Sequence, residues 1–210
     1  MKFSKKDFGF AIITGLMTGL IVWRLMEFWN ITRIANFENP SYFWLVFFVP
    51  ILWIAGVWLG YFLGKWVSFF NQFGKFVAIG FTNAAIDFGV LNLLIAYTGQ
   101  ALGLSFSIFK GISFVVAVTN SFFWNKYWAF EAGSSHGGKA EAIKFFAVNF
   151  VALAVNVSIA SFVANGIDPF LGFSDKAWAN ISAVSAAAIS LMFTFVGFRL
   201  IVFKKNEPVE

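Results

Sequence analysis

The chain has 210 residues, of which 60% are hydrophobic and only 12% are charged, and its mean hydropathy is +0.78. Soluble domains are about 45–50% apolar and about 25% charged, so this composition predicts an integral membrane protein and excludes an ordinary soluble domain. Cysteine is absent, which excludes disulfides, thiolate metal sites and cysteine nucleophiles. The formal net charge of +5 is typical of cytoplasmic loops beside anionic lipid, so we expect contact with membrane lipids and not with nucleic acid.

Six apolar segments are long enough to cross a bilayer, which requires about 20 helical residues. Their apolar runs are continuous, whereas the strands of a membrane β-barrel alternate over about 10 residues. We therefore predict an all-α fold, a polytopic helical membrane bundle with six transmembrane helices. They are expected over residues 8–29, 42–64, 75–98, 104–125, 143–165 and 178–202.

The distribution of basic residues predicts how these spans are oriented. With both termini in the cytoplasm, most of the 15 basic residues fall on the inner side. The positive-inside rule therefore favours a multi-pass protein of the cytoplasmic (inner) membrane with N and C termini inside. The inner set is Lys2, Lys5, Lys6, Lys65, Lys75, Lys126, Lys139, Lys144, Arg199, Lys204 and Lys205.

Glycines spaced four residues apart indicate that the first two spans are packing elements. Gly15 and Gly19 form one such pair, and Gly56, Gly60 and Gly64 form two in succession. Small residues at this spacing let helix backbones approach closely in lipid. We expect these faces to lie against neighbouring helices.

A charged pair lies near the outer end of the first span. Arg24 and Glu27 are three residues apart, so they share one helix face. We expect them to pair with each other, and this reading is favoured over a functional site.

Two segments in the second half of the chain are similar to each other. GKFVAIGFTNAAIDFGVLNLL contains Lys75, and IKFFAVNFVALAVNVSIASFV contains Lys144. Each continues from Lys-Phe into a spanning helix, and Asp87 of the first aligns with Asn156 of the second. The similarity predicts an internal repeat, which either frames a shared site or only records a duplication.

The second helix of each repeat also ends alike, in NKYWAF and then in FRLIVF. Lys126 precedes Phe130 by four residues, as Arg199 precedes Phe203. Both units begin and end on the cytoplasmic side, so the repeat is parallel. We predict two parallel two-helix repeats, from the third to the sixth span, preceded by two added spans.

The stretches KFVAIGFTNAAIDFGVLNLL, NSFFWNKYWAF, KFFAVNF and FRLIVFKK together resemble the GtrA-like family of small membrane proteins. The resemblance covers about residues 72–205, and its most specific part is the motif around 125–130. It implies an N-terminal two-helix transmembrane extension over 1–70 and a GtrA-like four-helix domain over 71–205. The chain departs from the family at Phe198, where the second motif usually carries Asn.

This resemblance implies a part in cell-envelope polysaccharide synthesis. Members look like translocases that flip polyprenyl-phosphate-linked monosaccharides, which a partner glycosyltransferase makes on the cytoplasmic leaflet. The family is also similar to non-transporting subunits that anchor or regulate polyprenyl-phosphate sugar synthases. A third hypothesis, from the residues alone, is a small proton-coupled exporter. None of these roles makes the chain an enzyme, and we expect no cofactor and no metal.

Asp87 is the first candidate for binding the substrate. It lies near the bilayer midplane, where a carboxylate costs about 2.5–3.5 kcal/mol, so it should face the bundle interior with Asn83 one turn before it. It is expected to relay protons, to accept hydrogen bonds from sugar hydroxyls or to pair with a cation. The alternative is a structural hydrogen bond to a neighbouring helix. Lys110 of the fourth span either reaches Asp87 or extends outward to the interface.

The second candidate group ends the fourth and sixth spans, at the inner leaflet. Lys126 and Arg199 recur at matching positions, and Asn120, Asn125 and Trp128 surround the first of them. A lipid phosphate needs a cation, amides for hydrogen bonds and aromatics beside its sugar or chain. The alternative is an ordinary cation at a helix C-terminus. Because a two-helix repeat is small for a complete path, a homodimer is also expected.

Overall fold

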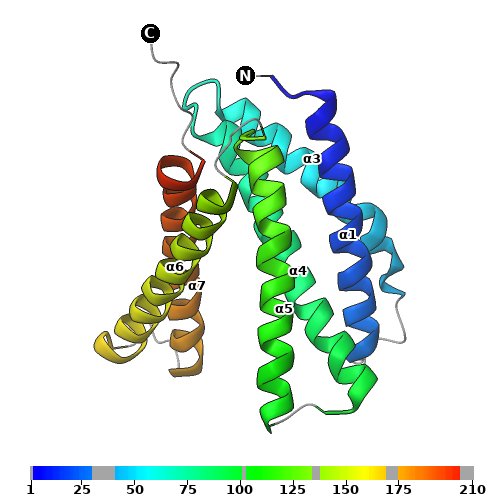
Figure 1. Cartoon of the computed structure of the whole chain (residues 1–210), viewed down its shortest axis with the longest axis vertical. Coiled ribbons are helices and arrows are strands. Elements are labelled where there is room, and N and C mark those ends of the chain that lie inside the picture. Colours follow the sequence, from blue (N-terminus) through cyan, green and yellow to red (C-terminus); the bar gives the residue numbers. More distant parts are fainter. Residues whose placement is uncertain (1, 30–40, 101–102, 134–137, 169–174, 204–210) are drawn as a thin grey trace. The chain divides into compact units, whose positions relative to one another are not determined.

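The structure, a computed structural model, describes residues 2–29, 41–100, 103–133, 138–168 and 175–203 (Figure 1). Every element among these residues is helical, which confirms the all-α prediction with six long helices. The long helices are α1 (Lys5–Trp29), α3 (Leu45–Leu63), α4 (Phe70–Thr98), α5 (Gly103–Trp124), α6 (Gly138–Gly166) and α7 (Asp175–Gly197). A 3-10 helix, η1 (Tyr42–Trp44), precedes α3, and two π-helices, η2 (Asn125–Ala129) and η3 (Phe198–Val202), follow α5 and α7.

The helices have the length and apolar surface of membrane crossings. Within the described ranges, four stretches combine sufficient length with high hydropathy, namely Lys5–Glu27, Tyr42–Leu63, Phe70–Thr98 and Ser185–Val202. Large apolar side chains such as Ile51 and Leu93 are exposed, as expected for a surface in contact with lipid. The chain is therefore a polytopic helical membrane protein.

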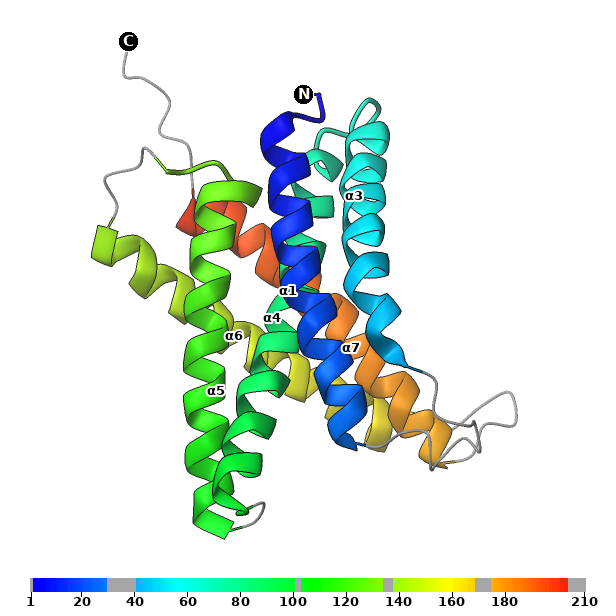
Figure 2. The same cartoon turned by 90° about the vertical axis from the view of Figure 1, so that its right-hand side faces the viewer.

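The chain forms two compact units, residues 1–131 and 132–210. In the first unit, α1 packs against α3 and α4, and α4 also packs against α5. The starts of α1 and α4 and the end of α5 lie at one end of this unit, and the end of α4 and the start of α5 lie at the other (Figures 1 and 2). The first unit thus joins the two added spans to the first repeat, whereas the division at residue 70 follows the family resemblance and stays a prediction.

Helices α1 and α3 pack through the first glycine pair. A Cβ added to Gly15 would lie 2.5 Å from Pro50 Cα, and one added to Gly19 would lie 2.6 Å from the Leu45 carbonyl oxygen. Both contacts are with backbone, which cannot move aside without separating the helices. The close packing expected of these glycines is confirmed.

We expect Gly19→Leu to lower the free energy of unfolding by about 1–3 kcal/mol, because the larger side chain overfills this contact. The matched control is Gly9→Leu on the same helix, since a Cβ at Gly9 meets nothing within 4 Å. Thermal denaturation of both variants in detergent measures the difference. Equal melting temperatures would show that the α1–α3 contact contributes nothing.

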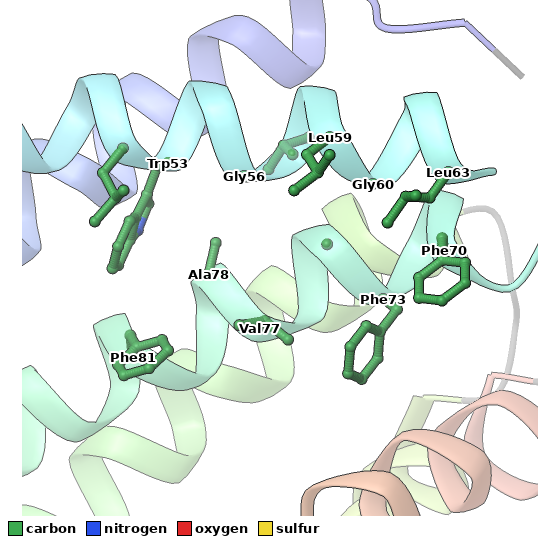
Figure 3. Close-up of a pocket in the computed structure, with 13 residues that line it drawn as sticks. Trp53, Gly56, Leu59, Gly60, Leu63, Phe70, Phe73, Val77, Ala78 and Phe81 are labelled. Carbon is green, nitrogen blue, oxygen red and sulfur yellow. The ribbon is translucent and has the colours of Figure 1, made fainter. Parts of the chain in front are cut away.

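Helices α3 and α4 approach each other through the second glycine series. A Cβ on Gly60 would lie 2.8 Å from the Phe70 carbonyl oxygen, and one on Gly74 would lie 3.2 Å from the Gly56 carbonyl oxygen. Beside this contact lies an apolar groove of about 340 Å³ (Figure 3). Gly56 borders the open groove, and its own Cβ would meet nothing within 4 Å. The glycine prediction is therefore confirmed for close packing at Gly60.

Hydrogen bonds between buried side chains hold α4 to the added helices. Thr18 Oγ1 donates to Thr82 Oγ1 at 3.0 Å, and Trp53 Nε1 donates to the same oxygen at 3.2 Å. Thr82 in turn donates to the Ala78 carbonyl. These three side chains come from α1, α3 and α4. The opposite face of α4 packs against α5.

The second unit consists of α6, α7 and η3. Ser190 Oγ of α7 donates to the Ala152 carbonyl of α6 at 2.8 Å. A Cβ on Gly197 would lie 2.7 Å from Val148 Cγ1, so the helices are close at the end of α7. Phe195 is fully buried between them. The second repeat is thus also a packed helical pair.

Candidate functional site

Helices α4 and α5 meet along faces that carry polar side chains. Ser113 Oγ of α5 donates a hydrogen bond of 2.6 Å to Asp87 Oδ1 of α4. Asn83 lies one turn before Asp87 on the same face of α4. Asn120 lies two turns after Ser113 on the same face of α5. We call these four residues the polar seam.

Two atoms of the polar seam have no hydrogen-bond partner among the residues described. They are Asn83 Oδ1 and Asn120 Nδ2, both fully buried. The other amide atom of Asn120 is used, because Trp124 Nε1 donates to Asn120 Oδ1 at 2.9 Å. A buried polar atom left unpaired costs about 1–3 kcal/mol, so such atoms point to a polar ligand or water.

The polar seam leads toward the end of α5, where the helix widens into the π-helix η2. Phe130 N–H donates to the Asn125 carbonyl at 2.9 Å, five residues back. Single π-helical turns are frequent at functional sites, because they shift side chains out of the regular register. Asn125 and Lys126 are both buried here, at 1% and 7% exposure. Asn125 Nδ2 donates to the Ser121 carbonyl, whereas Asn125 Oδ1 has no partner in the described structure.

At the same end of the unit, three charged groups form a buried cluster. Lys75 Nζ lies 2.8 Å from Asp7 Oδ1 and 2.9 Å from Glu131 Oε1. The side chains of Lys75 and Asp7 are each 2% exposed, whereas that of Glu131 is 40% exposed. We call Asp7, Lys75 and Glu131 the ion cluster. Glu131 has a positive φ of 53°, a conformation in which non-glycine residues are uncommon, and its bond to Lys75 holds it there.

Aromatic hydroxyl and indole groups complete the hydrogen bonding of Asp7. Tyr61 Oη donates to Asp7 Oδ2 at 3.0 Å, and Trp128 Nε1 donates to Asp7 Oδ1 at 3.1 Å. Ser4 caps the N-terminus of α1, where its backbone N–H and its hydroxyl also donate hydrogen bonds to Asp7 Oδ2. The Asp7 carboxylate therefore links α1, α3, α4 and η2 in one buried network.

A model of the family described as GtrA/DPMS, transmembrane domain, matches residues 75–203. The chain belongs to this family. The match begins at Lys75 of the ion cluster and ends at Phe203, the residue that closes η3. Asp7 and Tyr61 lie outside it, so the ion cluster binds the N-terminal helices to the first residue of the GtrA/DPMS match.

Other proteins add little beyond membrane location. A protein of Bacillus subtilis (strain 168), described as the uncharacterized membrane protein YngA, is 28% identical to the chain over 130 residues. The aligned part covers 62% of this chain and 78% of that protein. No solved structure matches the chain.

Within the GtrA/DPMS match, the second repeat ends in the same geometry as the first repeat. Phe203 N–H donates to the Phe198 carbonyl at 2.8 Å, as Phe130 does to the Asn125 carbonyl. The ring of Phe145 lies 6.2 Å from that of Phe203, and the aligned pair, Phe76 and Phe130, lies at 6.4 Å. The predicted repeat is thus present in backbone and side-chain geometry.

At residue level the two ends differ. Phe198, at the position of Asn125, stacks on Phe145 with ring centroids 4.2 Å apart. Arg199 is exposed, whereas Lys126 is buried. Only the first repeat has amide chemistry at its π-helix.

The predicted site residues fall into separate groups in the GtrA/DPMS protein. Asn83, Asp87 and Asn120 belong to the polar seam, and Asn125, Lys126 and Trp128 lie at the end that contains η2. Arg199 lies in the other compact unit. Lys110 belongs to α5, but its side chain lies outside the described part of the structure. Whether these residues bind substrate stays a prediction.

Two of these residues have surroundings that the sequence did not suggest. Trp128 is fully buried, and its indole N–H is occupied by Asp7. Lys126 lies over the Phe122 ring, with Nζ 5.9 Å from the ring centroid. The Trp128 indole N–H is therefore already engaged within the protein, and the Lys126 ammonium lies beside an aromatic ring.

The ion cluster was not among the sequence-based site residues. One signal was present, since Ser4 and Asp7 have the spacing of a helix-capping box. The sequence alone shows Lys75 only as an inner cation and as the start of a repeat. Within the described ranges, no group of three or more metal-binding side chains comes together.

Proposed function

We propose that this GtrA/DPMS protein flips a polyprenyl-phosphate-linked monosaccharide across the cytoplasmic membrane, for modification of cell-surface polysaccharide. The observation that carries the proposal is the polar seam. Its buried Asn83 Oδ1 and Asn120 Nδ2 lack partners among the described residues. A sugar offers hydroxyl groups that donate to the first atom and accept from the second. The family resemblance supplies the class of lipid-linked sugar.

The spacing of these groups suits a path through one leaflet. At about 1.5 Å of rise per residue, Asn120 lies about 10 Å along α5 from Ser113, and Lys126 lies about 20 Å from it. Ser113 donates a hydrogen bond to Asp87, so polar groups follow one another from η2 to the middle of α4. A sugar moving along the seam exchanges hydrogen bonds stepwise. Its prenyl chain remains in the lipid.

In this proposal Lys126 receives the phosphate at the η2 end of the polar seam, on the cytoplasmic side. A buried ammonium attracts an anion more strongly than an exposed one, because the surroundings screen its charge less. Asn125 lies beside it. Arg199 is exposed in the second unit, where it offers charge and a bidentate contact to a phosphate at the membrane surface. Both termini are placed in the cytoplasm, as the basic residues indicate.

Transbilayer movement in liposomes tests the function. Purified protein is reconstituted with a fluorescent polyprenyl-phosphate hexose, and the fraction accessible to a quencher outside is followed in time. We expect the inner-leaflet pool to become accessible faster than in protein-free liposomes. Movement at the protein-free rate, with the protein folded and inserted, would rule out transport.

The second candidate is a non-transporting anchor or regulatory subunit of a polyprenyl-phosphate glycosyltransferase. An exposed aromatic row favours it, in which Trp58 and Phe62 of α3 stack with centroids 5.8 Å apart and Trp66, just beyond the end of α3, packs edge-on against Phe62. Aromatic residues are enriched at protein–protein interfaces, so such a row fits a partner protein in the membrane. This candidate predicts that a glycosyltransferase co-purifies and loses activity alone, and that liposomes show no movement.

The transport proposal also includes a glycosyltransferase, as the source of the lipid-linked sugar, and a homodimer, which would supply a second seam. Neither role requires chemistry by this chain, so we propose no catalytic residue. Cross-linking in native membranes tests both partners. A dimer predicts a cross-linked band at twice the mass of the 23.4 kDa chain.

A further inference from the structure

A second groove, of about 520 Å³, lies between α1 and α4 in the first unit. Its walls are apolar along most of their length, with Leu20 and Leu25 from α1 and Val90 and Leu93 from α4. One cation and one amide, Arg24 and Asn92, also line it. The proposed function uses none of these residues.

The polar groups of the groove lie at the membrane face opposite to the N-terminus. Arg24 follows Lys5, the first residue of α1, by 19 residues, and Asn92 follows Phe70, the first residue of α4, by 22, which corresponds to about 28 Å and about 33 Å of helix. The hydrocarbon core is about 30 Å thick, so both side chains reach the far interface. The predicted orientation makes this the outer leaflet.

The groove is as long as one leaflet is thick. On α4 its lining runs from Ile86 to Ala96, which is about 15 Å of helix and half of the hydrocarbon core. At Gly89 the two helices are in contact, since a Cβ there would lie 2.7 Å from Ile21 Cγ2. A polyprenyl chain is much longer than such a groove. The fit is to the acyl chain of an ordinary phospholipid.

Arg24 can receive a phosphate at the mouth of this groove. It is paired with Glu27 at 2.9 Å, but the two side chains are 71% and 43% exposed. Exposed pairs of this kind contribute about 0–1 kcal/mol, so an anion can replace the carboxylate. The guanidinium binds phosphate through two parallel hydrogen bonds. It also lies over the ring of Trp23, 5.4 Å from its centroid, which limits its movement.

We propose that this groove is a binding site for an anionic phospholipid of the leaflet opposite to the N-terminus, of the phosphatidylglycerol class. One acyl chain fills the groove, and the phosphate takes the place of Glu27 on Arg24. Because α1 precedes the GtrA/DPMS match and α4 begins it, the lipid joins the added helix to the family domain.

Native mass spectrometry of the full chain, with phosphatidylglycerol titrated against phosphatidylcholine, tests the site through two variants. Arg24→Gln should weaken the apparent affinity for phosphatidylglycerol about tenfold, the effect of losing one charge-assisted contact. Glu27→Gln should strengthen it about twofold, because it removes the competing carboxylate. Both variants break the same ion pair and both residues are exposed, so a purely structural pair would move the affinity in one direction only.

Ala96→Trp provides an independent test, because the larger side chain fills the groove and leaves Arg24 and Glu27 unchanged. It should reduce phosphatidylglycerol retention and leave the fold intact. The proposal is overturned if both charge variants shift affinity in the same direction, or if phosphatidylcholine is retained equally. It is also overturned if Ala96→Trp instead dissociates a dimer, which would assign the groove to a second copy of the chain.

Discussion

Replacing Lys75 with methionine is expected to lower the free energy of unfolding by about 3–5 kcal/mol, the usual effect of removing one partner of a buried ion pair. Lys75 Nζ lies 2.8 Å from Asp7 Oδ1 and 2.9 Å from Glu131 Oε1. Glu131 is partly exposed and regains water, but Asp7 is left as a buried charge without its cation. Chemical denaturation in detergent, followed by tryptophan fluorescence, measures the loss.

The repeat supplies a matched control, because Lys144 aligns with Lys75 but is exposed. We expect Lys144→Met to change the unfolding free energy by less than about 0.5 kcal/mol. Adding Asp7→Asn to Lys75→Met should recover part of the loss, since it removes the uncompensated charge. Equal stability of the two methionine variants would show that the ion cluster does not hold the N-terminal helices to the GtrA/DPMS domain.

The second large effect is expected on transport. Asp87→Leu should reduce the initial rate of transbilayer movement by about ten- to hundredfold. A hydrogen bond to a charged group is worth about 1.5–3 kcal/mol, and each 1.36 kcal/mol is about tenfold in rate. Asp87 and Ser113 form the part of the polar seam that is farthest from η2 along α5. There a sugar must exchange hydrogen-bond partners away from water. The measurement is the liposome assay described above, at equal amounts of inserted protein.

Asn92→Leu is the control for removing a polar side chain from α4. Asn92 lies on the same helix but lines the other groove, and its Nδ2 donates to the Phe88 carbonyl. We expect its transport rate to stay within about twofold of wild type, as for a residue that makes no contact in the transition state. If both variants slow movement equally, the effect belongs to the helix and not to the polar seam.

The helices could be predicted from the sequence because membrane thickness fixes their length. The third span was expected at 75–98 and α4 runs from Phe70 to Thr98, so only its start differs. The additional turn begins before Lys75 because that lysine is buried against Asp7 and does not mark a solvent boundary. The repeat was also predictable, because matched Phe residues close both π-helices.

The ion cluster could not be predicted in the same way. Asp7 and Glu131 are 124 positions apart, and each looks like an ordinary polar residue at a helix end. Only the packing of α1 against α4 brings Asp7 to Lys75, and helix packing in lipid follows shape, not hydrophobic pattern. The burial of Trp128 follows from the same contact.

The polar seam was predictable in part. Asp87 and Asn83 were expected on one inward face, and this follows from helical spacing. Ser113 was missed because a serine in an apolar helix is common and usually bonds its own backbone. Its bond to Asp87 depends on the register between α4 and α5, which the short connection between them does not determine.

In the transport proposal, the sugar head of the lipid passes through the polar seam. Site-specific photocrosslinking tests it most directly, with a photoreactive residue placed at Asn83 in the seam or at Phe88, which is 47% exposed on the same helix. Membranes are supplied with a polyprenyl-phosphate hexose labelled in the sugar. We predict labelled protein from position 83 and little from position 88. Labelling from position 88 alone, or equally from both, would show that the sugar does not pass through the polar seam.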